Sequence, residues 1–405
     1  MKVTRVEKHI IKHNHAYYQL LDDFCFKSKN LYNFANYQIR KEFIKESKYI
    51  HYNELDKLLK KDGFNYDYKQ MPIVQSSQQL LRLLDKNWKS FFASIKDYKK
   101  NPNKYTGRPK LPKYLKKNGR QIVILTNQNC KLKDNMVKFP KSFNGFTLNT
   151  KIEEGLQQVR ILPGNKHIII EIVYKIEVKE NKLDNGKYLS IDIGLDNFAT
   201  IVNNVGQIPV VINGKGLKSI NKWYNKKISH YREVAKRINN LDWTDRMNNL
   251  TIKRNNVISN FIHQASNWTI KHALSLNCNT IVIGNNKDWK RESKMSKRVN
   301  QSFVGIPHQM YIQQLQYKAE NVGLNVIITE ESYTSKCSFL DLEDVCKQSV
   351  YKGKRIKRSM FLSAENKLIN ADVNGAYNIM RKVFSDAFAN GVLGVGLHPV
   401  RVNVI

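Results

Sequence analysis

Two aspartates in distant parts of the chain stand where a carboxylate could do chemistry. Asp192 interrupts the apolar run "YLSIDIG" of residues 188–194, and Asp372 opens a helical pattern in "INADVNGAYNI". Burial disfavours an ionised carboxylate unless a cation or hydrogen bonds compensate it. Two Mg²⁺ ions roughly 4 Å apart need bridging anionic ligands of this kind. The pair indicates metal-dependent phosphodiester hydrolysis; structural hydrogen bonding for Asp192 and helix capping for Asp372 are the ordinary alternatives.

Asp192 is positioned by a predicted hairpin of two buried strands. Gly194 and Gly206 punctuate the segment, and a largely β-branched run, residues 199–202, follows the first strand. Two helical patterns come next, with apolar residues at three- and four-residue steps over residues 220–238 and 257–273. A short buried strand is then predicted over residues 280–283. The order of elements places two helices between strands that can share one sheet.

These segments resemble a known family. The stretch "IDIGLDNFAT" (residues 191–200) is similar to the first catalytic motif of RuvC-like nuclease domains, and "NADVNGAYNI" (370–379) is similar to the third. With "ESYTSKCSFL" and the N-terminal "LLDDFCFKSKNLYNFANYQIR", they resemble TnpB, the OrfB protein of bacterial insertion sequences and a relative of compact type V CRISPR effectors. The resemblance covers nearly the whole chain. It implies an Mg²⁺-dependent, RNA-guided DNA endonuclease with a two-metal site.

The same resemblance implies the partners. They are a guide RNA transcribed from the element's end, a double-stranded target DNA, and a separate transposase that acts alongside. Base pairing would supply sequence choice, while the protein reads a short motif beside the target.

The third carboxylate is where the sequence departs from the family pattern. Gly284 occupies the position at which the second RuvC motif usually carries a catalytic glutamate. The next predicted strand, "LNVIITEESY", ends in Glu330 and Glu331, and neighbouring strands lie about 4.8 Å apart, so a long side chain could fill the space over a glycine. Because side chains alternate faces, only one of the two can point into the site. We favour Glu331, because "GNNKDWK" combined with "ESYTSK" resembles a TnpB branch with its acid there.

The candidate catalytic and Mg²⁺-binding residues are therefore Asp192, Glu331 and Asp372. Gly284 leaves a second interpretation open, in which Glu330 and Glu331 are a solvated strand end and the protein is a nuclease-inactive, RNA-guided DNA-binding repressor. A third hypothesis, a self-sufficient transposase that joins DNA ends, predicts DNA activity of the protein alone, and the resemblance speaks against it.

The segment 334–369 stands where the family has a zinc ribbon with two CxxC pairs. Only Cys337 and Cys346 are present there, nine positions apart. Two thiolates cannot complete the four-ligand shell of a structural zinc. We therefore predict no structural zinc, with a ribbon held by packing.

The pattern predicts an α+β multidomain fold. It would combine an RNase H-like (RuvC) α/β nuclease domain with a β-barrel wedge domain into which a helical recognition lobe is inserted. The predicted parts are the wedge at 1–14 and 115–182, the helical lobe with a basic linker at 15–114, the nuclease domain at 183–333 and 370–386, the degenerate ribbon at 334–369 and a C-terminal tail at 387–405.

Composition agrees with a nucleic-acid partner. The 405 residues include 68 Lys and Arg against 34 Asp and Glu, a formal charge of +34. Such an excess favours association with polyanions, although a merely basic protein or a membrane-surface binder would share it. No apolar run approaches the roughly 20 residues of a membrane span, so no membrane partner is expected. Five scattered cysteines argue against a secreted disulfide framework and predict a cytoplasmic protein.

Overall fold

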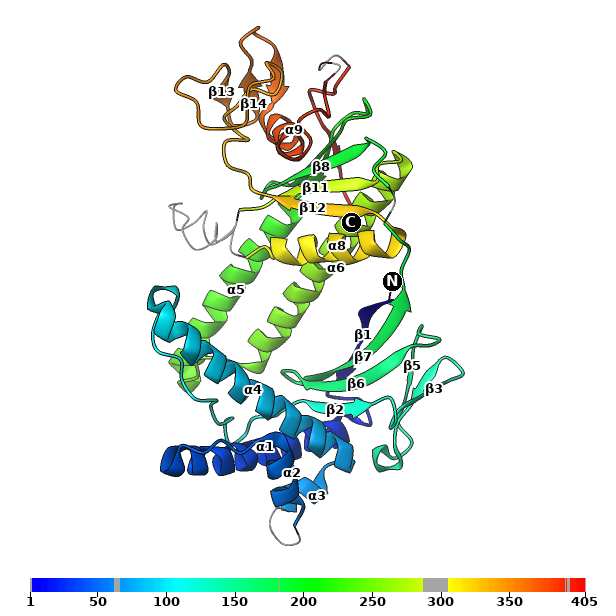
Figure 1. The fold of residues 1–405 in the computed structure, drawn as a ribbon, viewed down its shortest axis with the longest axis vertical. Helices are drawn as coiled ribbons and strands as arrows, with labels where there is room; N and C mark the ends of the chain where they lie inside the picture. Colours follow the sequence, from blue (N-terminus) through cyan, green and yellow to red (C-terminus); the bar gives the residue numbers. More distant parts are fainter. Residues whose placement is uncertain are drawn as a thin grey trace. The chain divides into compact units, whose positions relative to one another are not determined.

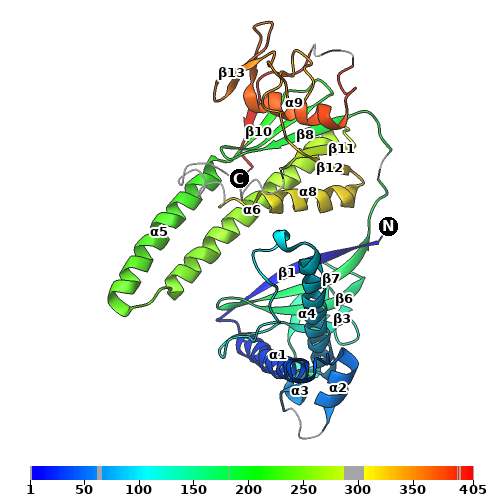
Figure 2. The same cartoon turned by 60° about the vertical axis from the view of Figure 1, so that its left-hand side comes forward.

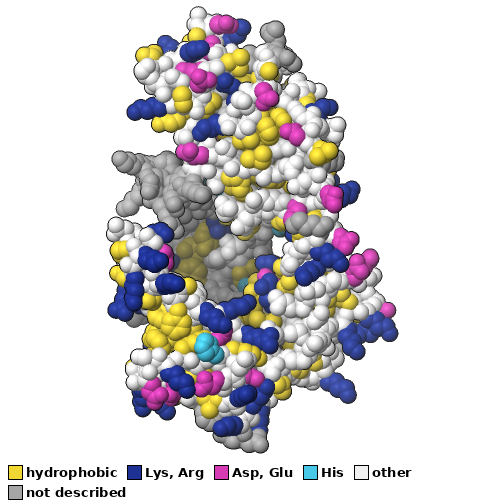
Figure 3. Space-filling model, in the orientation of Figure 1, with side chains coloured by type: hydrophobic (Ala, Val, Ile, Leu, Met, Phe, Trp, Pro, Cys, Tyr) yellow, Lys and Arg dark blue, Asp and Glu magenta, His cyan; other side chains and the backbone are white. Residues whose placement is uncertain are grey.

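A computed structural model describes residues 2–61, 66–181, 183–286, 305–389, 391 and 394–404. The chain divides into two compact units, residues 2–177 and residues 178–405 (Figures 1 and 2). Among the described residues, no helix combines the length and the apolar character that crossing a bilayer requires. Lys and Arg side chains are spread over the visible surface of both units (Figure 3).

The N-terminal unit contains two antiparallel sheets. One has the strand order β1-β7-β6-β2 and the other β3-β4-β5. The first strand of the chain therefore joins strands that lie more than a hundred residues later, and it pairs with β7 from Lys2 opposite Glu177 to Lys12 opposite His167. The strands are β1 (Lys2–Lys12), β2 (Val123–Thr126), β3 (Lys131–Lys133), β4 (Met136–Lys138), β5 (Thr147–Asn149), β6 (Leu156–Pro163) and β7 (His167–Glu177). The predicted barrel region consists of these two sheets.

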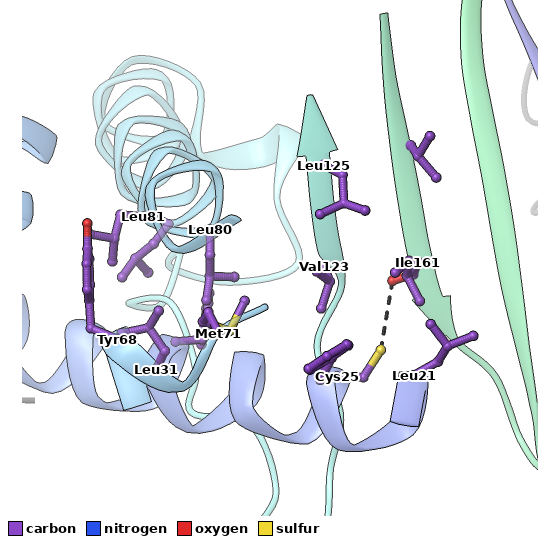
Figure 4. Close-up of a cluster of buried hydrophobic side chains, with 14 of the residues drawn as sticks. Leu21, Cys25, Leu31, Tyr68, Met71, Leu80, Leu81, Val123, Leu125 and Ile161 are labelled. Carbon is purple, nitrogen blue, oxygen red and sulfur yellow. Dashed lines mark hydrogen bonds between the residues drawn. The ribbon is translucent and has the colours of Figure 1, made fainter. Parts of the chain in front are cut away.

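Helices inserted between β1 and β2 pack against the larger sheet of this unit. Leu21 and Cys25 of one helix meet Val123 and Ile161 of the strands, and the Cys25 thiol donates to the Ile161 carbonyl at 3.9 Å (Figure 4). Trp88 is fully buried and belongs to the same core. The elements are α1 (Tyr18–Glu46), α2 (Tyr52–Lys60), α3 (Tyr66–Gln70), α4 (Val74–Lys100) and the short 3₁₀ turn η1 (Pro102–Lys104). A second 3₁₀ turn, η2 (Lys141–Phe143), lies between β4 and β5.

The C-terminal unit is built on one mixed sheet with the order β12-β11-β8-β9-β10-β16. β8, β9 and β10 form an antiparallel meander, and β11 and β12 add in parallel beside β8. Counted from β8, this is the order 3-2-1-4-5 with one strand added at an edge, which is the RNase H-like layout. The strands are β8 (Tyr188–Ile193), β9 (Asn197–Asn203), β10 (Val210–Asn213), β11 (Thr280–Gly284), β12 (Asn325–Thr329) and β16 (Val400–Val402).

The two faces of this sheet carry different helices. Leu189, Ile191 and Ile193 of β8 belong to a core shared with α6 and α8, whereas Tyr188 belongs to a second core shared with α9. Side chains alternate along a strand, so Asp192 faces the same side as Tyr188, toward α9. The helices are α5 (Lys215–Asn239), α6 (Asp245–Ser275), α8 (His308–Val322) and α9 (Ala371–Val383).

A small three-stranded sheet lies in the chain between β12 and α9. Its strands are β13 (Lys354–Lys357), β14 (Met360–Leu362) and β15 (Leu368–Asn370). Before it, the thiol of Cys337 is buried while Cys346 is exposed. The carboxylate of Glu343, itself buried, accepts the backbone N–H groups of Ser338 at 2.7 Å and Lys352 at 2.9 Å.

The predicted α+β multidomain class and the hairpin around Asp192 are confirmed. The C-terminal segment does more than the predicted short tail, because β16 pairs in parallel with β10 and completes the sheet edge. The bounds of the predicted wedge, helical lobe, nuclease domain and ribbon stay predictions.

Candidate active site

Asp192 lies where β8 passes under α9. At Gly375 of α9, a Cβ atom would lie 3.1 Å from the Asp192 Oδ2 atom, closer than most such contacts. The backbone of α9 therefore packs directly against the Asp192 carboxylate. The glycine in the "VNGAY" motif is explained by this close approach.

Glu331 lies over Gly284, the end of the neighbouring strand. A Cβ atom at Gly284 would fall 2.6 Å from the Glu331 Oε1 atom, 2.7 Å from its Cγ atom and 2.5 Å from the Ile379 Cδ1 atom. The space that a side chain at position 284 would need is therefore occupied by the Glu331 side chain. A glutamate at position 284 and Glu331 in this conformation exclude each other.

Asn286 holds Glu331 in this place. Its side-chain oxygen accepts the backbone N–H of Glu331 at 3.0 Å, and its side-chain nitrogen donates to the Glu331 Oε2 atom at 3.3 Å. The other carboxylate oxygen, Oε1, is buried without a hydrogen-bond partner. Glu330, the other residue weighed for this role, is exposed. The rest of the "GNNKDWK" signal, from residue 287, lies outside the described residues.

Asp372 stands in the first turn of α9, but it does not cap the helix. The cap is Asn370, whose side chain accepts the N–H groups of Asp372 at 3.0 Å and Val373 at 3.2 Å. The Asp372 carboxylate instead accepts a hydrogen bond from the side-chain amide of Asn197, which donates to Oδ2 at 2.7 Å. Arg355 of the ribbon lies 3.6 Å from Oδ1. The ordinary capping explanation for Asp372 therefore does not apply.

Asp192 and Asp372 open into one cavity of about 320 Å³. The ribbon contributes Arg355 and Arg358 to its wall, and Asn197 contributes from β9. Glu331 does not line this cavity. The structure thus joins Asp192 to Asp372 through a shared cavity and places Glu331 on the adjoining strand end.

The electrostatics couple the three acids. Burial raises the pKa of Asp192 well above its ordinary value, and the charges of Glu331 and then Asp372 raise it further, while Arg355 opposes them. Burial raises the pKa of Glu331 to about 7, against the opposing charge of Lys382. Neither shift is relieved by an ion pair in the part of the chain that the structure describes. The centre therefore disfavours the ionised forms of two of its three acids.

Comparison with known proteins identifies the chain's relatives. A family model for OrfB of IS605, described as a probable transposase, matches residues 171–290. The model of the TNB domain of Cas12f1-like proteins matches residues 308–379. Both matches agree with the resemblance to TnpB/OrfB that the motifs suggested, and the predicted resemblance is thereby confirmed.

A curated member of the same kind aligns along most of the chain. The TnpB-like protein ORF457 of Acidianus two-tailed virus is 23% identical over 396 residues, which cover 88% of this chain and 81% of that protein. Among solved structures, a Cas12f1–sgRNA–target DNA complex matches at 14% identity and a TM-score of 0.36, over 93% of this chain and 98% of that one. The mini-RNA-guided endonuclease CRISPR-Cas phi3 matches at 9% identity and a TM-score of 0.48, over 98% and 94%.

The donor set of this TnpB-like chain suits a hard divalent cation. Carboxylate oxygens are the ligands that Mg²⁺ prefers, and the orphaned Oε1 atom of Glu331 is an acceptor without a donor. Within the described ranges, however, no group of three or more His, Cys, Asp or Glu side chains is close enough to hold one metal ion. The residues fit the metal in kind and charge, and the acids surround the centre without forming a closed ligand set.

Sequence reasoning missed the polar residues that orient the acids. Asn197, Asn286 and Arg355 lie in different segments from the acids that they contact. Asn197 and Asn286 stand inside the quoted motifs "IDIGLDNFAT" and "GNNKDWK". The sequence does not reveal which acid each of these amides contacts. Arg355 belongs to the ribbon's "KGKRIKR" run, which in sequence is indistinguishable from a solvated charge run.

Proposed function

We propose that this protein is an RNA-guided DNA endonuclease whose active centre consists of Asp192, Glu331 and Asp372. The observation that carries the proposal is the coupling of three acids from distant segments, with Asp192 disfavoured as an anion by burial and by both of the others. Strongly perturbed carboxylates beside a cavity are candidates for function. The matches to the models of OrfB of IS605, a probable transposase, and of the TNB domain of Cas12f1-like proteins support the same assignment.

The chain's own residues have separable roles in this proposal. Asp192 and Asp372 present oxygens to the shared cavity, and Glu331 presents one from the strand end. Asn197 orients Asp372 through its amide. Arg355 and Arg358 offer guanidinium groups beside the acids, where they can pair with the phosphates of a bound strand. Divalent metal, when bound, would activate the attacking water and stabilise the leaving 3′ oxygen.

Guide RNA and double-stranded target DNA are the proposed partners. The formal charge of +34 favours a polyanionic partner, and base pairing with the guide would supply the sequence choice. The proposed metal is Mg²⁺, because it is bound by carboxylates together with substrate phosphates.

A nuclease-inactive, RNA-guided repressor is the second candidate function. Gly284 favours it, because the usual glutamate of the second motif is missing, as does the absence of a closed ligand set among the described residues. The pairing of Asp192 with Asp372 in one cavity disfavours it, because a protein that only binds DNA has no need for two acids that share a cavity.

The test is cleavage of a supercoiled target plasmid, with Mg²⁺ or EDTA, by protein copurified with RNA from its own locus. We expect metal-dependent linearisation that is abolished in Asp192→Ala and Glu331→Ala. Glu330→Ala is the matched control, because it removes an exposed neighbouring carboxylate, and it should still cut. Guide binding by Asp192→Ala should stay within a few-fold of wild type.

The outcomes separate the candidates. Tight guided binding without cutting by the wild type would establish the repressor. Cutting that is lost in Glu330→Ala and kept in Glu331→Ala would show that the third acid is Glu330 and not Glu331. Loss of guide RNA from Asp192→Ala would show that Asp192 serves the fold or the RNA.

A further inference from the structure

One face of α9 touches every part of the candidate centre. Asp372 carries a carboxylate, Gly375 meets Asp192, Ile379 lies over Gly284, and Lys382 reaches the turn after β12. These four α9 positions are spaced three, four and three residues apart, which places them on one stripe of an α-helix. The helix therefore spans the distance between the Asp372 end of the centre and the Glu331 end.

Lys382 is the least expected member of this stripe. Its ammonium donates to the Glu330 carbonyl at 3.2 Å, to the Ser332 carbonyl at 3.0 Å and to the Ser332 hydroxyl at 3.0 Å. A lysine ammonium has three donors, so these three acceptors account for all of them. The group is thus committed to the backbone immediately before and after Glu331, with no donor left for the carboxylate.

The backbone of Glu331 itself is fixed by other partners. Its N–H donates to Asn286, and its carbonyl accepts from the Thr334 hydroxyl at 2.8 Å and the Thr334 N–H at 3.2 Å. With Lys382 holding the flanking carbonyls, the main chain on both sides of Glu331 is tied down. Neighbouring side chains on an extended segment point to opposite sides, so a slip here would exchange Glu331 for the exposed Glu330.

We propose that Lys382 is a positioning residue that fixes the Glu331 carboxylate over Gly284 for metal binding. This inference rests on the proposed function. A lysine in the last turn of a helix is also favoured by the helix dipole alone. The dipole does not explain why all three donors of Lys382 bind Glu330 and Ser332, which lie in another segment of the chain. Outer-shell partners of metal ligands typically change metal affinity by about 10- to 100-fold when they are removed.

The test is calorimetric titration of Mn²⁺, as a probe for the divalent metal, into the full-length chain without RNA. We expect Lys382→Met, which keeps the apolar stem and removes the donors, to raise the Kd for Mn²⁺ by about tenfold or more. If that variant does not fold, Lys382→Gln, whose amide has two N–H donors in place of three, replaces it with the same expected direction. Urea unfolding of each variant in EDTA measures how much stability is lost independently of metal.

Arg381→Met is the matched control. Arg381 is the adjacent cation on α9, and its guanidinium donates to the carbonyls of Glu343 at 2.8 Å and Leu342 at 3.0 Å, away from Glu331. It should lower stability without changing the Kd for Mn²⁺. Equal shifts in Kd for both variants, or no shift in Lys382→Met, would overturn the positioning role.

The titration also distinguishes failure of the inference from failure of the proposed function. Wild-type protein that takes up no Mn²⁺, or an Asp192→Ala variant that takes up as much as the wild type, would remove the metal centre and the inference with it. Uptake that depends on Asp192 and is indifferent to Lys382 would leave the nuclease proposal standing and overturn only the role of Lys382.

Discussion

The buried acids of the N-terminal unit are treated differently from Asp192 and Glu331 of the C-terminal unit. In the N-terminal unit, Asp85 accepts hydrogen bonds from Tyr49 at 2.8 Å and from the Tyr52 N–H at 3.3 Å, and it pairs with Lys89 at 2.7 Å. Burial acts to raise the pKa of Asp85, but the bonds from Lys89 and Tyr49 lower it on balance.

The other buried acids of that unit follow the same rule. Asp56 pairs with Lys60 at 2.6 Å and accepts from the Tyr68 hydroxyl at 2.7 Å. Glu171 lies between two cations, Lys8 and Arg160, at 3.0 and 2.8 Å. Each carboxylate that folding withdraws from water has been given donors, as stability alone requires.

In the C-terminal unit, Asp192 and Glu331 are different. Burial is the first cause of the raised pKa of both, and neighbouring acids add to it for Asp192. Acids whose ionised form is disfavoured in this way are candidates for function. The comparison therefore separates acids that hold the fold from the acids proposed to bind metal.

The largest expected effect on stability is at Asp85, one of the compensated acids of the N-terminal unit. Asp85→Asn should lower the free energy of unfolding at pH 7 by about 2–3 kcal/mol, because Lys89 loses its anionic partner and faces an amide N–H group instead. The folded-state pKa of Asp85 is depressed, so its contribution is present above the ordinary value of 3.8 and is lost as the pH falls through the folded value. Urea unfolding at pH 7 and pH 3 measures the difference.

The control for that change is Asp134→Asn. Asp134 is exposed and lies 4.0 Å from Lys138, and asparagine tolerates its positive φ of 55°. Its substitution should leave stability unchanged. If the two substitutions cost the same, the compensation seen around Asp85 contributes nothing to the fold.

The next effect concerns the room that Glu331 occupies. Gly284→Ala should reduce cleavage by about 10- to 100-fold, because the new methyl group would lie 2.6 Å from the Glu331 Oε1 atom and must displace it. Gly216→Ala in α5 is the matched control, since a Cβ atom there meets nothing within 4 Å, and it should cut normally. Full activity of Gly284→Ala would show that the position of Glu331 over the glycine is irrelevant to cutting.

A smaller effect, of opposite sign to that of Asp85, is expected at Glu331 itself. Glu331→Gln removes a charge that burial disfavours and keeps an oxygen for Asn286, so in EDTA the free energy of unfolding at pH 8 should rise by about 1 kcal/mol. Chemical unfolding of variant and wild type under identical conditions measures it. A loss of stability instead would place Glu331 among the acids that hold the fold.

The contrast also shows what a sequence can reveal. The hairpin that carries Asp192 was predicted because its signals are local: an apolar run, a β-branched run and glycines at its ends. The start of α9 was predicted for the same reason. The α+β class was predicted from local patterns together with the family resemblance, whereas the full strand order of the sheet comes from the structure.

What could not be predicted is set by contacts between distant residues. Asn197 is 175 residues from Asp372, and Lys382 is 52 residues from Glu330. β16 is three residues long, too short for a pattern, and its place beside β10 depends on an available sheet edge. The position of Glu331 over Gly284 was inferred from a vacancy; its role in catalysis stays a prediction.

The last prediction concerns the ribbon, where neither metal removal nor loss of a cysteine is expected to change stability. Glu343 ties two backbone N–H groups, those of Ser338 and Lys352, within the segment where the family has its zinc, and Cys346 is exposed. A buried carboxylate that accepts two backbone N–H groups can hold such a loop without metal, and two cysteines cannot fill a tetrahedral shell. We therefore expect a strong chelator, and Cys346→Ser, to leave the unfolding midpoint unchanged. The zinc content of the purified protein is measured by inductively coupled plasma mass spectrometry. One equivalent of zinc that is lost together with stability on chelation would contradict the prediction that this segment has no structural zinc.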